Sequence, residues 1–203
     1  MTGDAGTVSA PARPPGTDES RSGWQSYLAR QPKGGSAMIQ EPQLQARVAQ
    51  PYAGIRMTVP MDGISGAVDE AFPELFGWLG ANGIAPSGPP FIRYLVIDMA
   101  ADLMLDLGIP VTVSITASAR VQPGVLPKGR YAVLRHTGPY DGLIAANAAL
   151  QEWAREHGVD FDAWETAKGS AWRCRVEHYL TDPAGEPDPA KWEVDVAYLT
   201  REP

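Results

Sequence analysis

The chain contains two degraded copies of one sequence pattern, and this duplication limits its possible folds more than any other feature. The copies span residues 51–110 and 127–199. Each opens with a proline and a tyrosine–alanine pair, then continues with a turn, a helix-length segment, a strand ending in an acidic residue, and a last strand. Two copies are too few for a solenoid. The pattern therefore predicts one pseudo-symmetric domain, with a central ligand cleft at the seam between the halves.

Hydrophobic periodicity predicts an α+β fold in which each half is a strand, a helix and two further strands. Alternating apolar residues indicate strands, and apolar residues three and four apart indicate helices. Asp62 or Ser65 is expected to cap the first helix, and Asp141 the second. The apolar stripe of the second helix is Leu143, Asn147, Leu150 and Ala154. Strands are expected over residues 43–48, 54–59, 91–99, 103–111, 119–125, 130–134, 172–180 and 191–199.

Residues 1–37 have a different composition from the rest of the chain. They are rich in proline, glycine, serine and threonine, and apolar residues show almost no periodicity there. Such a segment cannot bury enough apolar surface to offset the entropy lost on ordering. We therefore expect a disordered tail over 1–37 and the domain over 38–203. Met38 could also be the natural first residue, because the folded pattern begins directly after it.

Charge and residue counts exclude several function classes. The chain carries a formal charge of −7, and residues 38–203 carry −8 because the tail has four basic and three acidic residues. This argues against nucleic acid as a partner. With one cysteine, Cys174, and three scattered histidines, no metal site and no cofactor are expected. No apolar run is long enough to span a membrane and no secretory signal is visible, so we expect a cytoplasmic protein without a membrane partner.

A carboxylate among aromatic residues is the feature that bears on chemistry. The chain has no nucleophile elbow, phosphate-binding loop, dinucleotide-binding loop or zinc-protease motif. The second half is rich in tyrosine and tryptophan, and Glu177 stands inside a strand, where glutamate is disfavoured. Aromatic rings with an internal carboxylate can enclose a flat or cationic ligand. Alternatively, Glu177 faces solvent and pairs with Arg175, two positions away on the same face.

Five motifs in order make the sequence resemble the GyrI-like small-molecule-binding family. That family also supplies the effector domains of some AraC-type and multidrug-responsive MerR-type regulators. The motifs agree in order and spacing across residues 43–200. They are Gly88-Pro89-Pro90-Phe91-Ile92-Arg93-Tyr94 with Asp98, residues 126–133, residues 136–143, Val176-Glu177-His178-Tyr179-Leu180-Thr181-Asp182-Pro183, and residues 192–199.

The resemblance implies a duplicated fold with a ligand cleft between the halves, and it implies a role for Glu177. In multidrug-sensing relatives the matching glutamate is buried and meets cationic aromatic ligands. In enzymes of the same fold that hydrolyse cyclopropane-containing compounds, a glutamate is the catalytic base. The resemblance further implies that aromatic residues line this cleft: Trp192, Tyr94, Phe91, Tyr140 and Trp153.

Three functions are compatible with these residues. The first is a stand-alone module that binds an amphipathic, aromatic or cationic small molecule. The second is a hydrolase of reactive electrophiles with Glu177 as general base. The third is a module that binds a protein partner through its acidic surface. Regulators of the family carry a helix-turn-helix domain, and residues 1–37 are too short and too rich in proline and glycine to form one, so direct transcriptional regulation is not expected.

Overall fold

The computed structural model describes residues 38–98 and 101–202, so the segment for which we predicted a disordered tail lies outside the described residues. The described chain forms a ten-stranded antiparallel sheet and two α-helices, which confirms the predicted α+β class. The elements are β1 (Met38–Ile39), β2 (Gln43–Arg47), β3 (Gln50–Val59), η1 (Met61–Gly63), α2 (Ile64–Ala81), β4 (Phe91–Ile97), β5 (Leu103–Pro110), β6 (Val121–Leu126), β7 (Gly129–Thr137), η2 (Tyr140–Gly142), α3 (Leu143–Glu156), β8 (Ala163–Thr166), β9 (Gly169–Tyr179), η3 (Pro189–Lys191) and β10 (Glu193–Leu199).

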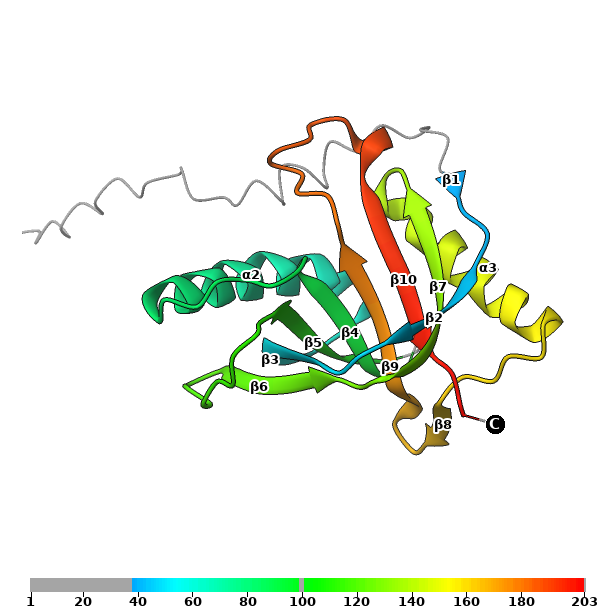
Figure 1. The fold of residues 1–203 in the computed structure, drawn as a ribbon, viewed down its shortest axis with the longest axis horizontal. Coiled ribbons are helices and arrows are strands. Elements are labelled where there is room, and N and C mark those ends of the chain that lie inside the picture. The colour runs from blue at the N-terminus through cyan, green and yellow to red at the C-terminus, as the bar shows by residue number, and fades with distance from the viewer. Residues whose placement is uncertain (1–37, 99–100, 203) are drawn as a thin grey trace, which may run out of the picture.

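The sheet contains the predicted duplication. The strand order is β1-β7-β10-β9-β4-β5-β3-β6, with β2 paired to β7 and β8 paired to β9. Each half contributes three neighbouring strands, and its helix follows the first of them. Figure 1 shows the two units side by side, with α2 beside β3, β4 and β5, and α3 beside β7. This is the strand–helix–strand–strand unit that the repeat predicts.

A pseudo-two-fold axis relates the two units and passes between β4 and β9. These strands pair with each other, one from each half, and Ile92 lies directly opposite Glu177. Tyr94 and Tyr179 each follow two residues later in their own strands. Ile92 and Glu177 therefore hold equivalent positions, and so do the two tyrosines. At this equivalent position the first half has an apolar residue, Ile92, and the second half has a carboxylate, Glu177, and the two are direct neighbours in the sheet.

The halves also exchange their leading strands. β2 precedes β3 in the chain but pairs with β7, whereas β6 precedes β7 but pairs with β3. Tyr52 in β3 lies opposite Gly124 of β6, and its counterpart Tyr131 in β7 lies opposite Gln45 of β2. Each half thus supplies an edge strand that completes the sheet of the other half.

Both helices cover the same face of the sheet. Residues of α2 such as Phe72 and Leu75 share a buried cluster with Ile92 and Leu105. Residues of α3 such as Leu150 share a cluster with β7 and β10. Burying a large apolar side chain contributes about 1.5–3 kcal/mol, so these stripes fix each helix on its half. The strand residues between them, on β4 and β9, form the floor of the space that separates the helices.

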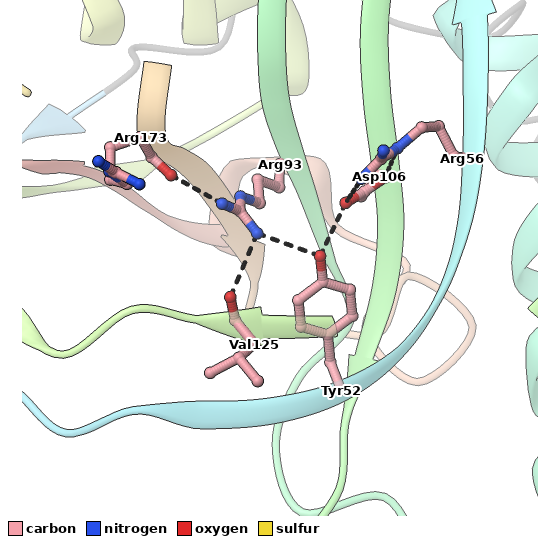
Figure 2. A network of polar contacts seen from close by, with 6 residues as sticks. All are labelled: Tyr52, Arg56, Arg93, Asp106, Val125 and Arg173. Carbon is pink, nitrogen blue, oxygen red and sulfur yellow. Dashed lines mark hydrogen bonds and ion pairs between the residues drawn. The ribbon is translucent and has the colours of Figure 1, made fainter. Parts of the chain in front are cut away.

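A polar network holds together the other face of the sheet. The buried carboxylate of Asp106 on β5 accepts hydrogen bonds from Arg56 and from the Tyr52 hydroxyl, at 2.7 Å each for the closest contacts. Arg93 on β4 then donates to the same hydroxyl at 3.2 Å and to the main-chain oxygens of Val125 and Arg173 at 3.2 and 2.7 Å. Figure 2 shows this chain of contacts, which links four strands of the sheet to the exchanged strand β6.

The predicted helix caps are wrong. The residues before α2 and α3 are Gly63 and Gly142, and no side chain makes a capping hydrogen bond at either helix start. Asp62 and Asp141 lie one residue earlier, inside η1 and η2, and Ser65 lies inside α2. A 3-10 turn precedes each helix and moves the carboxylates out of capping position. The matching turns are a further sign of the duplication.

Candidate functional site

A cavity of about 530 Å³ lies between α2 and α3 on the helix-covered face of the sheet. Its walls are mainly apolar, and its polar groups come from a few side chains on α2, η2, α3, β4 and β9. This size and composition are typical of small-molecule sites. The lining residues are Met61, Ile64, Ser65, Val68, Phe72, Pro90, Ile92, Tyr94, Ile97, Leu103, Tyr140, Leu143, Ile144, Asn147, Ala148, Gln151, Arg175, Glu177 and Tyr179.

Glu177 is buried at the floor of this cavity, with 4% of its surface exposed. Alternation along β9 points it toward the helices, and its neighbours in the adjacent strands are Ile92 and Val196. The opposite face of β9 is covered as well, because Cys174 and Val176 belong to a buried cluster. The solvent-facing alternative for Glu177 is therefore wrong: both faces of this strand are buried at this point.

Three neutral donors hold the Glu177 carboxylate. The hydroxyls of Tyr94 and Tyr179 donate to Oε2 at 2.9 and 3.1 Å, and the Asn147 side-chain amide donates to Oε1 at 2.8 Å. Burial, followed by the nearby Glu177, raises the pKa of both tyrosines well above its ordinary value. They therefore remain protonated donors. Because Tyr94 and Tyr179 are related by the pseudo-two-fold axis, each half contributes one arm of this clamp.

Asn147 connects the carboxylate to a second polar group. Its amide nitrogen also donates to the Leu143 carbonyl at 2.8 Å. Its side-chain oxygen accepts from Arg175 at 3.2 Å and from the Tyr198 hydroxyl. A carboxylate only accepts hydrogen bonds, so the amide orientation is fixed with nitrogen toward Glu177 and oxygen toward Arg175. Asn147 is thus fully hydrogen-bonded and stands between the two charges.

Arg175 lies in a cage of three aromatic rings. Its guanidinium carbon is 4.8 Å from the ring centroid of Tyr198, 5.2 Å from Trp172 and 5.3 Å from Tyr94. Cation–π contacts of this kind stabilise a guanidinium that has left bulk water. Arg175 and Glu177 do not form an ion pair, in contrast to the pairing considered from the sequence. Instead, both are hydrogen-bonded to the side chain of Asn147.

The structure brings together three of the six residues proposed from the sequence. Glu177, Tyr94 and Tyr140 all line the cavity. Tyr140 packs edge-on against Tyr179, with ring centroids 5.3 Å apart. Trp192 does not line the cavity; it is fully buried behind Tyr140, at a centroid distance of 4.6 Å, and its indole donates to the Glu186 carbonyl.

Phe91 and Trp153 lie away from the cavity. Phe91 points to the opposite face of the sheet, where it packs edge-on against Tyr52 at 5.0 Å. Trp153 stacks on His157 at 4.5 Å near the end of α3. Neither is a lining residue. The prediction that these two side chains line the cavity with Glu177 is therefore wrong.

Sequence reasoning missed Asn147, Arg175 and Tyr179 as site residues. The signal for Asn147 was present, because a polar residue inside an apolar helical stripe needs a buried partner. The signal for the other two was strand parity, since Arg175 and Tyr179 lie two positions on either side of Glu177 and point the same way.

The described part of the chain contains neither a metal-binding cluster nor a membrane-spanning helix. Residues 38–98 and 101–202 contain no cluster of three or more histidine, cysteine, aspartate or glutamate side chains able to hold a metal ion. Within the same residues, neither helix has the length and apolar character needed to cross a membrane.

Solved structures of three other proteins share this fold, and the first of them, EcmrR, is represented by two structures. The chain superposes on the EcmrR C-terminal domain with a TM-score of 0.66 at 16% identity, covering 82% of this chain and 100% of that one. In the cryo-EM structure of EcmrR with DNA, the values are 0.66 and 18%, with 81% of this chain and 58% of that chain covered. This chain therefore spans little more than half of that EcmrR chain.

The other two relatives are more distant. A structure described as a hydrolase from Listeria innocua has a TM-score of 0.55 at 16% identity, with 87% of this chain and 97% of that chain covered. SAV2435 bound to tetraphenylphosphonium has a TM-score of 0.52 at 10% identity, with 80% and 94% covered. At these identities the likeness shows the fold alone.

The family itself is identified from the sequence. No curated protein matches the chain. The family model of the GyrI-like small-molecule-binding domain matches residues 40–198, which include the first repeat, all but the last residue of the second, both helices and every residue that lines the cavity. The chain belongs to the GyrI-like small-molecule-binding family.

Proposed function

We propose that this protein binds an amphipathic, cationic aromatic small molecule in the cavity between α2 and α3, with Glu177 as the anchor for the positive charge. The observation that carries the proposal is a buried carboxylate in an apolar cavity whose hydrogen-bond donors are all neutral. Glu177 takes part in no ion pair among the described residues. A buried charge without a counter-ion is costly, and a bound cation offsets that cost.

The geometry leaves room for such a contact. A carboxylate has about four lone-pair sites, and three at Glu177 are occupied by Tyr94, Tyr179 and Asn147. The rings of Tyr140 and Tyr179 also line the cavity and offer faces or edges to an aromatic cation. The apolar wall from α2, including Val68 and Phe72, suits the hydrophobic part of the same molecule.

Arg175 restricts where the positive charge of the ligand can lie. Its guanidinium already occupies a cation–π position on Tyr94 and approaches Glu177 through Asn147. Like charges repel, so the cationic centre of a ligand is expected on the side of Glu177 toward Tyr140 and Tyr179. SAV2435, a relative of this fold, was solved with tetraphenylphosphonium, which is a cation of this chemical class.

Calorimetric titration with tetraphenylphosphonium tests whether the cavity is the binding site. We expect one molecule bound per chain. Ala148→Trp adds a bulky ring at the cavity rim on α3 and should weaken binding at least tenfold. Ala145→Trp is the matched control, because Ala145 is exposed on the same helix but does not line the cavity. Equal affinity of both variants would place the ligand elsewhere.

A hydrolase is the second candidate function. The observation that favours it is the position of Glu177, a buried carboxylate at a cavity floor where it could accept a proton from an attacking water. One relative of the fold is described as a hydrolase. Incubation with a cyclopropane-bearing alkylating compound, followed by mass spectrometry, separates the candidates. Turnover that Glu177→Gln abolishes supports hydrolysis, whereas binding without modification supports the binding module.

We propose that DNA is not a partner of this chain, although EcmrR was solved with DNA. The support is the charge of −8 on residues 38–203, obtained from −7 for the whole chain and +1 for residues 1–37. An acidic domain lacks the phosphate contacts that dominate DNA affinity. Mobility-shift assays at physiological salt should therefore show no retarded band at micromolar protein, and a retarded band would contradict the proposal.

A further inference from the structure

The sheet face opposite the helices contains matching polar positions in the two halves. Arg56 on β3 pairs with Asp106 on β5 at 2.7 Å, and Arg135 on β7 pairs with Asp195 on β10 at 2.8 Å. Each pair is a direct cross-strand neighbour in its ladder. Tyr52 and Tyr131 precede the two arginines by the same four residues. The duplication therefore provides an internal reference for what each position can do.

In the first half, Arg93 fills the space beneath the exchanged strand. Its guanidinium bridges the Tyr52 hydroxyl and two main-chain oxygens, as Figure 2 shows. The pseudo-two-fold axis, which sets Ile92 against Glu177, makes His178 the counterpart of Arg93. An imidazole is shorter than an arginine side chain and cannot fill the same volume. The second half therefore retains a hollow where the first half has a guanidinium.

This hollow is a second cavity of about 390 Å³. It lies beside β2, on the sheet face opposite the first cavity, since His178 and Glu177 are successive residues of β9 and point to opposite faces. Its polar lining includes Arg47, Tyr131 and His178, and its apolar lining includes Leu126 and Val176. The volume falls within the usual range for small-molecule sites.

Two polar groups of the second cavity, on Arg47 and His178, are poorly satisfied, whereas the Tyr131 hydroxyl donates to the Pro127 carbonyl at 2.6 Å. Arg47 is half-buried, lies 5.5 Å from the Tyr131 ring centroid, and donates to Gln45 only at the long distance of 3.4 Å. It joins no ion pair in the described chain. Burial lowers the pKa of Arg47, against a smaller opposing effect of Asp195, whose carboxylate is already held by Arg135.

His178 presents the second unsatisfied group. Its Nδ1 is buried and has no hydrogen-bond partner among residues 38–98 and 101–202. A neutral imidazole carries one N–H donor, and a guanidinium carries five, so both side chains can donate to one acceptor group. A carboxylate matches a guanidinium in geometry and charge, and it would offset the cost of burying Arg47.

We propose that the second cavity binds a small organic carboxylate, with its oxygens on Arg47 and His178 and its apolar body against Leu126 and Val176. The ligand occupies the place that the Arg93 guanidinium takes in the first half, and it completes the polar network between the exchanged strand β2 and the centre of the sheet. This site is independent of the proposed cation site on the helix-covered face.

Benzoate is a suitable probe, with benzamide as its neutral isostere. Titration calorimetry on the full chain should show one saturable benzoate site and at least tenfold weaker binding of benzamide. Arg47→Met keeps the aliphatic stem, removes the charge, and should weaken benzoate binding at least tenfold. Arg173→Met is the control, because Arg173 is exposed and pairs with Asp162 outside this cavity. Benzoate affinity unchanged in Arg47→Met would overturn the proposal.

Nitrogen-15 spectra of the imidazoles make the test independent of any variant. In the wild-type protein, benzoate should shift the ring resonances of His178, while those of His157, at the end of α3, stay unchanged. Tetraphenylphosphonium should leave the His178 resonances in place. No saturable benzoate binding, or binding that leaves His178 unchanged, would contradict the proposed site whatever the outcome at the first cavity.

Discussion

The two halves share one backbone plan but line the first cavity with different chemistry. The first half contributes mainly apolar side chains, among them Val68, Phe72 and Ile92. The second half contributes most of the polar ones, among them Asn147, Arg175 and Glu177. The contrast is sharpest on the pseudo-two-fold axis, where Ile92 and Glu177 are direct neighbours. The comparison indicates that the duplicated elements form the walls of the cavity, and that the positions at which the two halves differ supply its polar groups.

The same comparison holds on the other face of the sheet. The first half closes its network with Arg93, and the second half leaves a cavity at His178. On each face of the sheet, the second half has a cavity-lining residue, Glu177 or His178, where the first half has a structural one, Ile92 or Arg93. Both proposed sites therefore lie where the halves differ, and variants that restore symmetry should remove function or stability.

The largest effect is expected from separating the halves. We predict that neither half folds when the chain is split near residue 117, because β2 pairs with β7, β6 pairs with β3, and β4 pairs with β9 across the boundary. Each isolated half would lose these strand partners and would expose its part of the buried cluster that joins the two halves on the face opposite the helices. Calorimetry of each half should show no cooperative transition, and a cooperative transition in either would break the comparison.

Making the axis symmetric with charge should be the next largest effect. Ile92→Glu places a second carboxylate opposite Glu177, at a site with 1% exposure. Two buried carboxylates cannot both stay ionised, and the apolar contacts of Ile92 are lost as well. We expect a loss of about 3 kcal/mol or more in the free energy of unfolding, measured by urea denaturation. Ile92→Val, the control, should cost about 0.5–1.5 kcal/mol.

Making the helices symmetric should cost less. Asn147→Val gives α3 the residue type of Val68, the corresponding lining residue of α2. The change removes a donor to Glu177 and the acceptor for Arg175 and Tyr198. We expect about 1–3 kcal/mol of destabilisation in the same assay. Ala145→Val on the exposed side of α3 isolates the cost of a β-branched residue, about 0.5 kcal/mol. Equal losses in both variants would show that the Asn147 contacts contribute nothing.

The smallest effect concerns pH. Burial, and after it Arg47, lowers the pKa of His178 from 6.5 to about 4. Between these values the unfolded chain binds the proton and the folded protein does not, so stability falls as pH decreases from about 6.5 toward 4. The slope is at most about 1.4 kcal/mol per pH unit. His178→Phe should lose this contribution, so its unfolding free energy should fall less between pH 7 and pH 5 than that of the wild type; identical slopes would contradict it.

The repeat pattern was sufficient to predict the fold because it constrains strand number, helix placement and symmetry together. The pairing of β2 and β6 with the opposite half could not be predicted, since strand pairing depends on the assembled sheet rather than on the local sequence pattern. β1 and β8 were missed for the same reason: they are short strands that exist only through their pairing with β7 and β9.

For the site residues, too, local sequence patterns predicted some features, and others depended on the assembled structure. The low frequency of glutamate in strands identified Glu177 as unusual, but only the packing of both helices on one face shows that its side of the strand is buried. Parity could also have separated Phe91 from Tyr94, because three residues along a strand lead to opposite faces. Trp153 follows Asn147 by six residues, which turns it away from the Asn147 side of a helix. Trp192 lies inside the strand predicted over residues 191–199, but β10 begins at Glu193, so the alternation of that strand does not extend to it.

The most direct test of the account is the charge preference of the first cavity. Tetraphenylphosphonium and tetraphenylborate have nearly the same shape and opposite charge, and calorimetry gives the dissociation constant of each for the wild type and for Glu177→Gln. We predict that the wild type prefers the cation and that Glu177→Gln weakens cation binding about 30-fold or more, with little change for the anion. A ratio of the two dissociation constants that is the same in both proteins would contradict the assignment of Glu177 as the cation anchor.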